Sequence, residues 1–391
     1  MTATTPALAD AFVERFVIEP AADGPLRGTS FAVKDLFDVA GHHTGCGNPT
    51  WRATHAAATA NAAVVQALLQ AGARLIGKTR TDEMAYSIEG RNFHEGAPRN
   101  PAAPERLTGG SSSGAASAAA AGQVDFAIGT DTAGSVRVPA AWCGLVGLRP
   151  THARVSAAGL TPLAPSFDTV GWLARSTDLI LRVAGVLLGE RAAPASGLAL
   201  VRDAAVDGYA DQAVAVLLEP LFDTCAARGL RVREVSLVTD LKAVAECLRV
   251  LQAQEVWSTH GRWVESAQPR FGPGVAERFA AARGVTADQA RAAAHERAAI
   301  IARLDAVLPP GVMLCLPTVP APAPRRDASP EELQSLRSRL MPLTALASLS
   351  GRPQITLPLP GAEAAPVGFS LLGWRNGDEA LLKVVQLLAP R

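Results

Sequence analysis

The sequence predicts a single α/β domain: a large mixed, mostly parallel β-sheet with helices on both faces. Strand-like and helix-like segments alternate along most of the chain, as they do in repeated βα units. The chain has 391 residues, of which 48% are hydrophobic, and this is enough for one large core. No internal repeat and no shift in composition marks a linker, so we expect residues 1–391 to form one domain.

The predicted strands are short apolar runs bounded by polar or turn-forming residues. They lie at residues 31–37, 74–78, 124–128, 198–201, 231–237, 312–316, 354–359 and 367–372. Apolar residues at helical spacing, or alanine-rich composition, predict the helices. These cover residues 59–71, 115–121, 240–307 with a break at 272–274, and 378–388. Residues 91–110 are rich in Asn, Pro, Arg and Gly and are expected to form a loop.

Composition and charge exclude several classes of function. The chain carries 37 basic and 36 acidic residues without a run of like charges, so we expect neither a nucleic-acid partner nor a membrane surface. The first residues do not resemble a signal peptide, and no apolar run approaches the roughly 20 residues that span a bilayer. Five scattered cysteines without a C-x-x-C pair indicate a reducing compartment, and we expect a cytoplasmic protein.

Three segments contain residues that could carry out chemistry. The first is a lysine, Lys34, inside the apolar run FAVKDLF; the second is GGSSSG at 109–114; the third is GTDTAGSVRVP at 129–139. In the third, a predicted strand enters a small-residue turn that ends at Ser135. Free backbone N–H groups at such a turn can hold an oxyanion beside a serine hydroxyl. Taken alone, Ser135 could equally be a helix N-cap.

The glycine- and serine-rich segment has several interpretations. It could be a flexible linker, or a phosphate-binding loop that lacks the usual Lys-Ser/Thr ending. It also matches the G-x-S-x-G nucleophile elbow with Ser112 as nucleophile. An elbow needs a preceding strand, whereas the preceding residues are rich in proline. A nucleophile elbow also needs a histidine base later in the chain, and the sequence around each later histidine matches no known catalytic motif.

Lys34 could be a surface lysine whose stem packs along the sheet. A buried lysine can instead be neutral and act as a general base. Its pKa, ordinarily about 10.4, would then have to fall to about 7 through burial or nearby cations, at a cost of about 4 kcal/mol.

Together, these segments resemble the amidase signature family. The match comprises GGSSSG, then GTDTAGSVRVPAAWCGLVGLRPT, with Ser111 and Ser135 24 residues apart, and the lysine segment FAVKDLFDVAG. LPTVPAPAP at 316–324, SGRPQITLPLP and PVGFSLLG extend the resemblance from about residue 25 to the end. It implies the amidase signature fold, and it marks residues 190–310 as a variable, mostly helical lid region within the single domain.

The resemblance also implies the site. Ser135 would attack an amide carbonyl, and Ser111, with a cis peptide bond, would pass the proton to neutral Lys34. The oxyanion hole would be formed by the backbone N–H groups of Thr132, Ala133, Gly134 and Ser135. No metal, cofactor or histidine is implied.

Three neighbours are expected to support this site. Asp131 and Arg137 would orient the turn that carries Ser135. Ser112 would form a hydrogen bond with the proton relay of Ser111 and Lys34, or cap the following helix. Ala133 stands where many members have glycine, and its N–H remains usable if its φ is negative.

Several runs, among them DEMAYSIEG and SFDTVGWLARS, look like compact plant-type indole-3-acetamide amidases. An aryl-acetamide such as indole-3-acetamide is therefore the favoured substrate, and it calls for an apolar, aromatic pocket. The candidate lining residues, any of which could instead belong to the core, are Met84, Tyr86, Trp142, Phe167, Trp257 and Trp263. Acidic substrates such as malonamate are an alternative, since Arg91, Arg99 or Arg175 could bind their carboxylate.

Four alternatives accompany this interpretation. A carbamoyl or ureide hydrolase, such as one acting on biuret, and a malonamate hydrolase would keep the triad and change the pocket. A glutaminase subunit of a transamidosome would need partner subunits. A non-catalytic, amidase-like interaction module would lack the nucleophile. The resemblance leaves the oligomeric state open, including a homodimer, because some members dimerise through a longer N-terminal segment.

Overall fold

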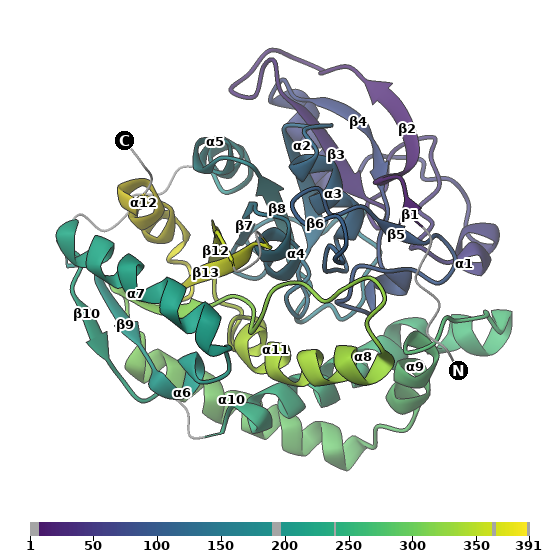
Figure 1. Ribbon diagram of the computed structural model, residues 1–391. Coiled ribbons are helices and arrows are strands. Elements are labelled where there is room, and N and C mark those ends of the chain that lie inside the picture. The colour runs from purple at the N-terminus through teal and green to yellow at the C-terminus, as the bar shows by residue number, and fades with distance from the viewer. Residues whose placement is uncertain (1–7, 190–196, 238–239, 362–364, 389–391) are drawn as a thin grey trace.

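The computed structural model describes residues 8–189, 197–237, 240–361 and 365–388. Its core is an 11-stranded sheet in the order β10-β9-β11-β13-β12-β7-β8-β6-β3-β4-β2, and β1 pairs with β5 separately (Figure 1). The strands are β1 (Leu8–Ala9), β2 (Phe12–Ile18), β3 (Ser30–Lys34), β4 (Arg74–Thr79), β5 (Ala97–Pro98), β6 (Phe126–Thr130), β7 (Val146–Arg149), β8 (Val170–Ala174), β9 (Ala199–Arg202), β10 (Val232–Glu234), β11 (Val312–Pro317), β12 (Gln354–Leu359) and β13 (Val367–Leu372).

The sheet is mixed, as predicted. Its parallel pairs form two groups, β10-β9-β11 at one end and β6-β3-β4 towards the other. Antiparallel pairs through β13, β12, β7 and β8 join the two groups, and β2 adds an antiparallel edge strand. The mostly parallel character that the sequence predicts therefore describes these two groups and not the centre of the sheet.

Helices cover both faces of the sheet, as predicted (Figure 1). They are α1 (Pro49–Thr54), α2 (Ala63–Gln70), the 3-10 turn η1 (Glu83–Ala85), α3 (Ser113–Ala120), α4 (Arg137–Trp142), α5 (Thr177–Leu187), α6 (Ala204–Asp207), α7 (Gln212–Ala227), α8 (Leu241–Ala267), α9 (Val275–Arg283), α10 (Ala287–Val307), α11 (Pro330–Ser350) and α12 (Asp378–Leu388). Side chains of α2, α5, α7 and α12 pack in one core cluster. Those of α3 and α4 form a second cluster, and those of α8, α10 and α11 a third.

Most predicted elements lie where the sequence places them, and the bounds of β12, β13 and α12 are as predicted. The strand predicted at 31–37 ends at Lys34 because the chain turns there, with Phe37 N donating to Lys34 O. The region 190–310 holds α8 to α10 and also contributes β9 and β10 to the sheet.

The sequence analysis missed α11, which positions part of the site. A capping box begins this helix: the Ser329 hydroxyl accepts from the Glu332 N–H, and the Glu332 carboxylate accepts from the Ser329 N–H. Pro342 lies inside the helix and obscures its pattern in the sequence. In the part of the chain described above, no helix has the length and apolar character needed to cross a bilayer.

Candidate active site

Lys34 is the last residue of β3, and β3 lies beside β6 in the sheet. Its Nζ donates to Ser111 Oγ at 2.7 Å and to Thr130 Oγ1, at the end of β6, at 2.7 Å. The side chain is fully buried, and no carboxylate among the described residues lies within ion-pair distance of it. Burial lowers the pKa of Lys34 to about 7, although the negative charge of Asp82 opposes this. A large fraction of the amine is thus neutral near pH 8 and able to accept a proton.

Ser111 lies between Lys34 and the nucleophile turn. Its peptide bond with Gly110 is cis, as the resemblance implies. Ser111 O accepts from Asp82 N at 3.1 Å, and the Asp82 carboxylate fills the space beside Gly110, where an added Cβ would lie 2.2 Å from Asp82 Oδ2. Asp82 itself is buried, and burial raises its pKa to about 6. The sequence analysis did not single out Asp82.

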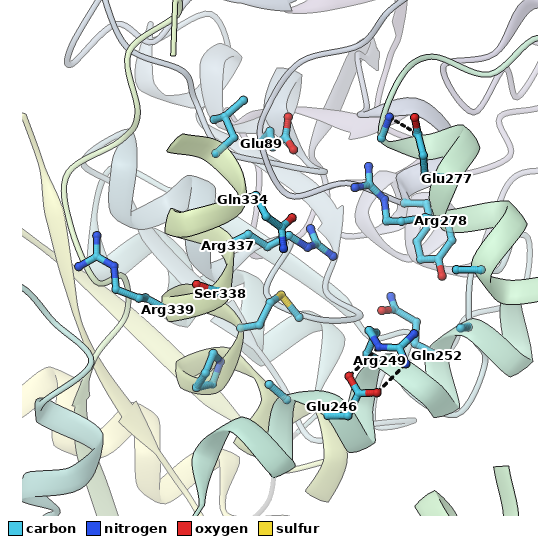
Figure 2. Close-up of a pocket in the computed structure, with 18 of the residues that line it drawn as sticks. Glu89, Glu246, Arg249, Gln252, Glu277, Arg278, Gln334, Arg337, Ser338 and Arg339 are labelled. Carbon is cyan, nitrogen blue, oxygen red and sulfur yellow. Dashed lines mark hydrogen bonds and ion pairs between the residues drawn. The ribbon is translucent and has the colours of Figure 1, made fainter. Parts of the chain in front are cut away.

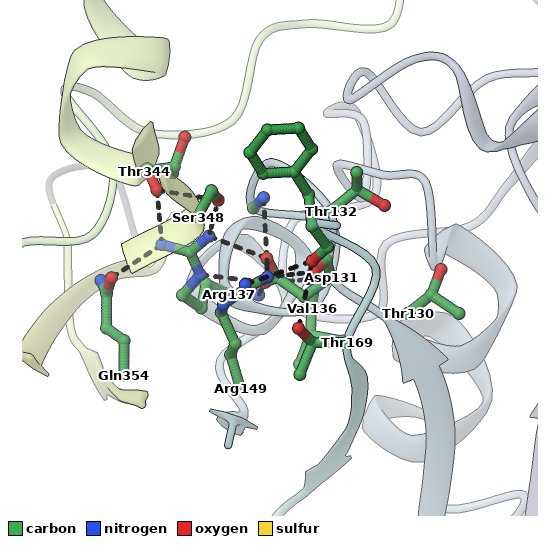
Figure 3. A network of polar contacts seen from close by, with 12 residues as sticks. Thr130, Asp131, Thr132, Val136, Arg137, Arg149, Thr169, Thr344, Ser348 and Gln354 are labelled. Atoms are coloured by element: carbon green, nitrogen blue, oxygen red, sulfur yellow. Dashed lines mark hydrogen bonds and ion pairs between the residues drawn. The ribbon is translucent and has the colours of Figure 1, made fainter. Parts of the chain in front are cut away.

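The nucleophile turn is built around the carboxylate of Asp131 (Figure 3). This carboxylate accepts from Gly134 N at 2.9 Å, from Val136 N at 3.1 Å and from the Arg137 side chain at 2.7 and 2.9 Å. Burial favours the protonated form of Asp131, but Arg137 and then Arg149 outweigh it and hold the pKa of the carboxyl well below its usual range. Asp131 is therefore ionised and fixes the loop that carries Ser135.

Two buried arginines connect this turn to the rest of the fold (Figure 3). Arg137 Nη1 donates to Thr344 O at 3.0 Å in α11 and to Gln354 Oε1 at 2.7 Å in β12. Arg149 Nη1 donates to Asp131 Oδ1 at 3.1 Å. These contacts give Asp131 and Arg137 the orienting position that the sequence predicts for them.

Ser112 joins the turn to α3 and β6. Its N–H donates to Ser135 O at 3.3 Å, which brings the backbone of Ser135 beside Ser111. Its hydroxyl accepts from Thr130 N and donates to Thr130 O, both at 3.3 Å. Ser112 thus holds backbone around the relay, and in the described structure its side chain is bonded to neither Lys34 nor Ser111. It cannot be the exposed nucleophile of an elbow.

The predicted oxyanion hole needs one correction. The N–H of Gly134 already donates to Asp131, so it is not a free donor. Among the described residues, the N–H groups of Thr132, Ala133 and Ser135 have no partner. Gly134 has a φ of 124°, whereas Ala133 does not have a positive φ, so alanine is accommodated at 133 and glycine is required at 134.

Asp168 supports the same turn and was not predicted. Thr132 Oγ1 donates to Asp168 Oδ1 at 2.6 Å, and Asp168 Oδ2 accepts from the N–H groups of Leu163 and Ala164 at 2.8 and 3.0 Å. This side chain therefore ties the start of the turn to the segment before β8. Within the ranges that the structure covers, no three His, Cys, Asp or Glu side chains gather as a metal site.

Ser135 opens into a narrow throat of about 10 Å³, roughly the space of one water molecule. The throat is lined by Ala85, Tyr86, Ser87, Ile88, Ala133, Ser135, Gln252, Arg337 and Met341. Four of these residues also line an outer cavity of about 1120 Å³, formed mainly by α8, α9 and α11 (Figure 2). The four shared residues are Tyr86, Gln252, Arg337 and Met341. The throat therefore connects Ser135 with the outer cavity.

Of the predicted substrate-binding residues, only Tyr86 lines these spaces. Met84 is buried in a core cluster beneath them, and Trp142 is buried under Gly109 with its Nε1 donating to Ala321 O at 2.9 Å. Both are corrected to core residues, because their side chains pack inward from η1 and α4.

The remaining aromatic candidates also lie outside the cavity lining. Phe167 is buried beneath Arg297, Trp257 packs beneath Arg283, and Trp263 lines a separate surface groove. Of the three arginines considered for acidic substrates, Arg91 lines the outer cavity. Arg175 bonds backbone carbonyls of 119 and 124, and Arg99 is exposed elsewhere.

Comparison with known proteins agrees with this geometry. The family model described as Amidase matches residues 7–382. Amidase 1 of Arabidopsis thaliana is 40% identical, over 97% of each chain. Translocon at the outer membrane of chloroplasts 64 of Pisum sativum is 35% identical, over 94% of this chain and 67% of its own length. A solved structure described as an amidase aligns with a TM-score of 0.85 and 34% identity, over 94% of this chain and 85% of that chain.

The family match extends over nearly the whole chain, and the fold is shared with an amidase of known structure. The residues that carried the resemblance in the sequence converge in one buried site. The chain therefore belongs to the amidase signature family and is a hydrolase of amides.

Proposed function

We propose that this protein hydrolyses a small primary carboxylic amide to a carboxylate and ammonia through an acyl-enzyme on Ser135. The observation that carries the proposal is the 2.7 Å hydrogen bond from buried Lys34 Nζ to Ser111 Oγ, in a site where no described carboxylate is paired with the lysine. A base needs a neutral amine, and burial with hydroxyl partners alone favours that form.

In the first step, Ser135 Oγ attacks the amide carbon, and its proton moves to Ser111 while the Ser111 proton moves to Lys34. The carbonyl oxygen becomes an oxyanion that the free N–H groups of Thr132, Ala133 and Ser135 can bind. Collapse breaks the C–N bond, and the relay returns the proton to the nitrogen, which leaves as ammonia. Water then attacks the ester by the same route, giving the carboxylate and restoring Ser135.

The aryl-acetamide expected from the sequence, such as indole-3-acetamide, finds support in Tyr86, Ile88 and Met341 at the throat. The outer cavity also has arginine, lysine and glutamate side chains in its lining, which a neutral aryl-acetamide does not need. A ureide hydrolase would keep the same triad. An interaction module is disfavoured because Lys34, Ser111 and Ser135 are all present in one site.

The test is ammonia release from a panel of amides by the wild type and by Ser135→Ala. The panel holds indole-3-acetamide, phenylacetamide, a short aliphatic amide, malonamate and biuret. We expect turnover by the wild type and none by Ser135→Ala, and a fluorophosphonate should label only the wild type. Turnover or labelling that persists in Ser135→Ala and disappears in Ser112→Ala would reject the assignment.

A further inference from the structure

Two arginine side chains of the outer cavity face each other, and neither forms an ion pair with a described carboxylate. Arg278 lies on α9 and Arg337 on α11, and their guanidinium groups point towards one another within the cavity (Figure 2). Both side chains are partly buried, and neither has a carboxylate within ion-pair distance among the described residues. Arg337 Nη1 and Arg278 Nε are shielded from solvent and have no hydrogen-bond partner in the described part of the structure.

The other arginines of the lining differ, because each has its own carboxylate. Arg91 pairs with Glu89 at 2.7 Å, Arg249 with Glu246 at 2.5 Å, and Arg339 with Asp211. The third carboxylate of the lining, Glu277, accepts from the backbone N–H of Gly274 at the start of α9. The described lining therefore has a cationic excess. Lys242 contributes to it from an exposed position, and Arg278 and Arg337 are its partly buried members.

Such an arrangement is unfavourable without an anion. Two guanidinium groups lose hydration and repel each other, and no acceptor among the described residues replaces the water lost at Arg337 Nη1 and Arg278 Nε. Burial, together with the charge of Arg278, lowers the pKa of Arg337 to about 10, although the negative charge of Glu89 opposes this, so the side chain is still charged at neutral pH. A carboxylate placed between the two would accept bidentate, charge-assisted hydrogen bonds from both planar groups.

We infer that the substrate is an amide whose acyl group ends in a carboxylate, a monoamide of a short dicarboxylic acid, and that Arg337 and Arg278 bind this carboxylate. The inference rests on the proposed function, because in a primary amide the acyl group is the only part that can extend into the outer cavity. Arg337 also lines the throat that ends at Ser135, so a short acyl chain can connect the carbonyl to the anion site.

The experiment compares succinamate with 4-oxopentanamide, a neutral amide of similar size and shape. For the wild type, we expect kcat/KM for succinamate to exceed that for 4-oxopentanamide by about 100-fold, as expected for a desolvated charge pair. In Arg337→Met this preference should fall to within about threefold, mostly through a higher KM, and Arg337→Lys should keep part of it. Malonamate and glutaramate then define the chain length.

The matched control is Arg339→Met, two residues further along α11. Arg339 lines the same cavity but is already paired with Asp211, so this variant should keep the preference for succinamate. Equal turnover of the two amides by the wild type, or a better rate with indole-3-acetamide that Arg337→Met leaves intact, would overturn the anion site.

Fluorophosphonate labelling separates this result from a failure of the proposed function. The probe needs Ser135 and its relay but no carboxylate site. If it labels the wild type and Arg337→Met alike while the amide preference is absent, the anion site is wrong and the nucleophile assignment stands. If it does not label the wild type, the proposed function itself is wrong.

Discussion

The nucleophile turn and the outer cavity each bring two arginine side chains together, and they differ in the charges that face those side chains. Arg137 and Arg149 share the carboxylate of Asp131, at 2.7 and 3.1 Å. Arg278 and Arg337 have no described carboxylate within ion-pair distance. The first pair has its counter-ion within the fold, and the second has no paired carboxylate in the described part of the chain.

The same contrast holds for two lysines on neighbouring strands. Lys78 on β4 pairs with Asp35 at 2.8 Å, whereas Lys34 on β3 bonds only to hydroxyl groups. Both are fully buried. A buried cation with its own carboxylate holds the fold together, whereas one without a carboxylate is available to a substrate or a proton. We therefore propose that pairing with a carboxylate, and not burial, separates the structural from the functional cations of this protein.

Exchanging each lysine for methionine is the strongest test of this contrast. We expect Lys34→Met to lower kcat/KM by about 1000-fold or more, since the relay loses its base. Its melting temperature should not fall, because methionine fills a similar volume and carries no charge to desolvate. Lys78→Met leaves the buried carboxylate of Asp35 without its cation and should lower the free energy of unfolding by about 3–5 kcal/mol. Amide hydrolysis and urea unfolding measure the two effects.

The contrast would be wrong for the lysines if Lys34→Met lost as much stability as Lys78→Met. Circular dichroism of both variants shows whether each is folded before its activity is compared. A folded Lys34→Met with near wild-type turnover would instead reject Lys34 as the base.

Removing the shared carboxylate is the corresponding test for the arginines. Asp131→Asn leaves Arg137 and Arg149 buried with a neutral partner, so we expect a loss of about 3–5 kcal/mol in the free energy of unfolding. Arg337→Met removes a cation that lacks a partner and should change stability by less than about 1 kcal/mol. Equal losses in the two variants, measured by thermal unfolding, would show that pairing does not separate the two regions.

Much of the fold could be predicted from the sequence because its strands are short apolar runs between clear turn residues. The edge strand β2 was missed because it pairs on one side only and its exposed positions, Arg15 and Val17, combine a charged and an apolar residue, so the strand has no clear polar–apolar alternation. The sheet was predicted as mixed and mostly parallel because repeated βα units favour parallel pairs. The run of antiparallel pairs at its centre was not foreseen, since β7 and β8 are joined without a crossover helix.

The candidate site, like the fold, could be predicted from the sequence only in part. Lys34, Ser111 and Ser135 lie in recognisable motifs, so their convergence could be expected before the structure was known. Asp168 lies in a run that resembles the family, but the run does not show which of its side chains supports the turn. Arg278 and Arg337 lie in segments without a motif, and the packing of α9 and α11 around the outer cavity brings these two arginines together. Charge balance within a cavity depends on three-dimensional proximity, which the spacing of residues along the chain does not reveal.

The pH dependence of turnover sharpens the interpretation of Lys34. The pKa of this lysine lies near 7, and only its neutral form accepts the proton. With a neutral amide as substrate, kcat/KM should therefore be constant above pH 8 and fall about tenfold per pH unit below pH 7. A rate that is constant from pH 6 to 9 would contradict a lysine base. Asp82 raises the pKa of Lys34, so Asp82→Asn should move the midpoint to lower pH.

The smallest expected effect is a change in stability on anion binding. Succinate, the product of succinamate hydrolysis, should raise the melting temperature of the wild type by a few degrees at about 100 times its Kd, compared with chloride at equal ionic strength. Arg337→Met should lose most of this increase and Arg339→Met should keep it, because Arg339 is paired with Asp211 whereas Arg337 has no described carboxylate within ion-pair distance. This measurement needs no turnover, so it tests the anion site even in a Ser135→Ala background. An increase of the same size in Arg337→Met would place the anion elsewhere, and the two arginine pairs would then differ in packing but not in function.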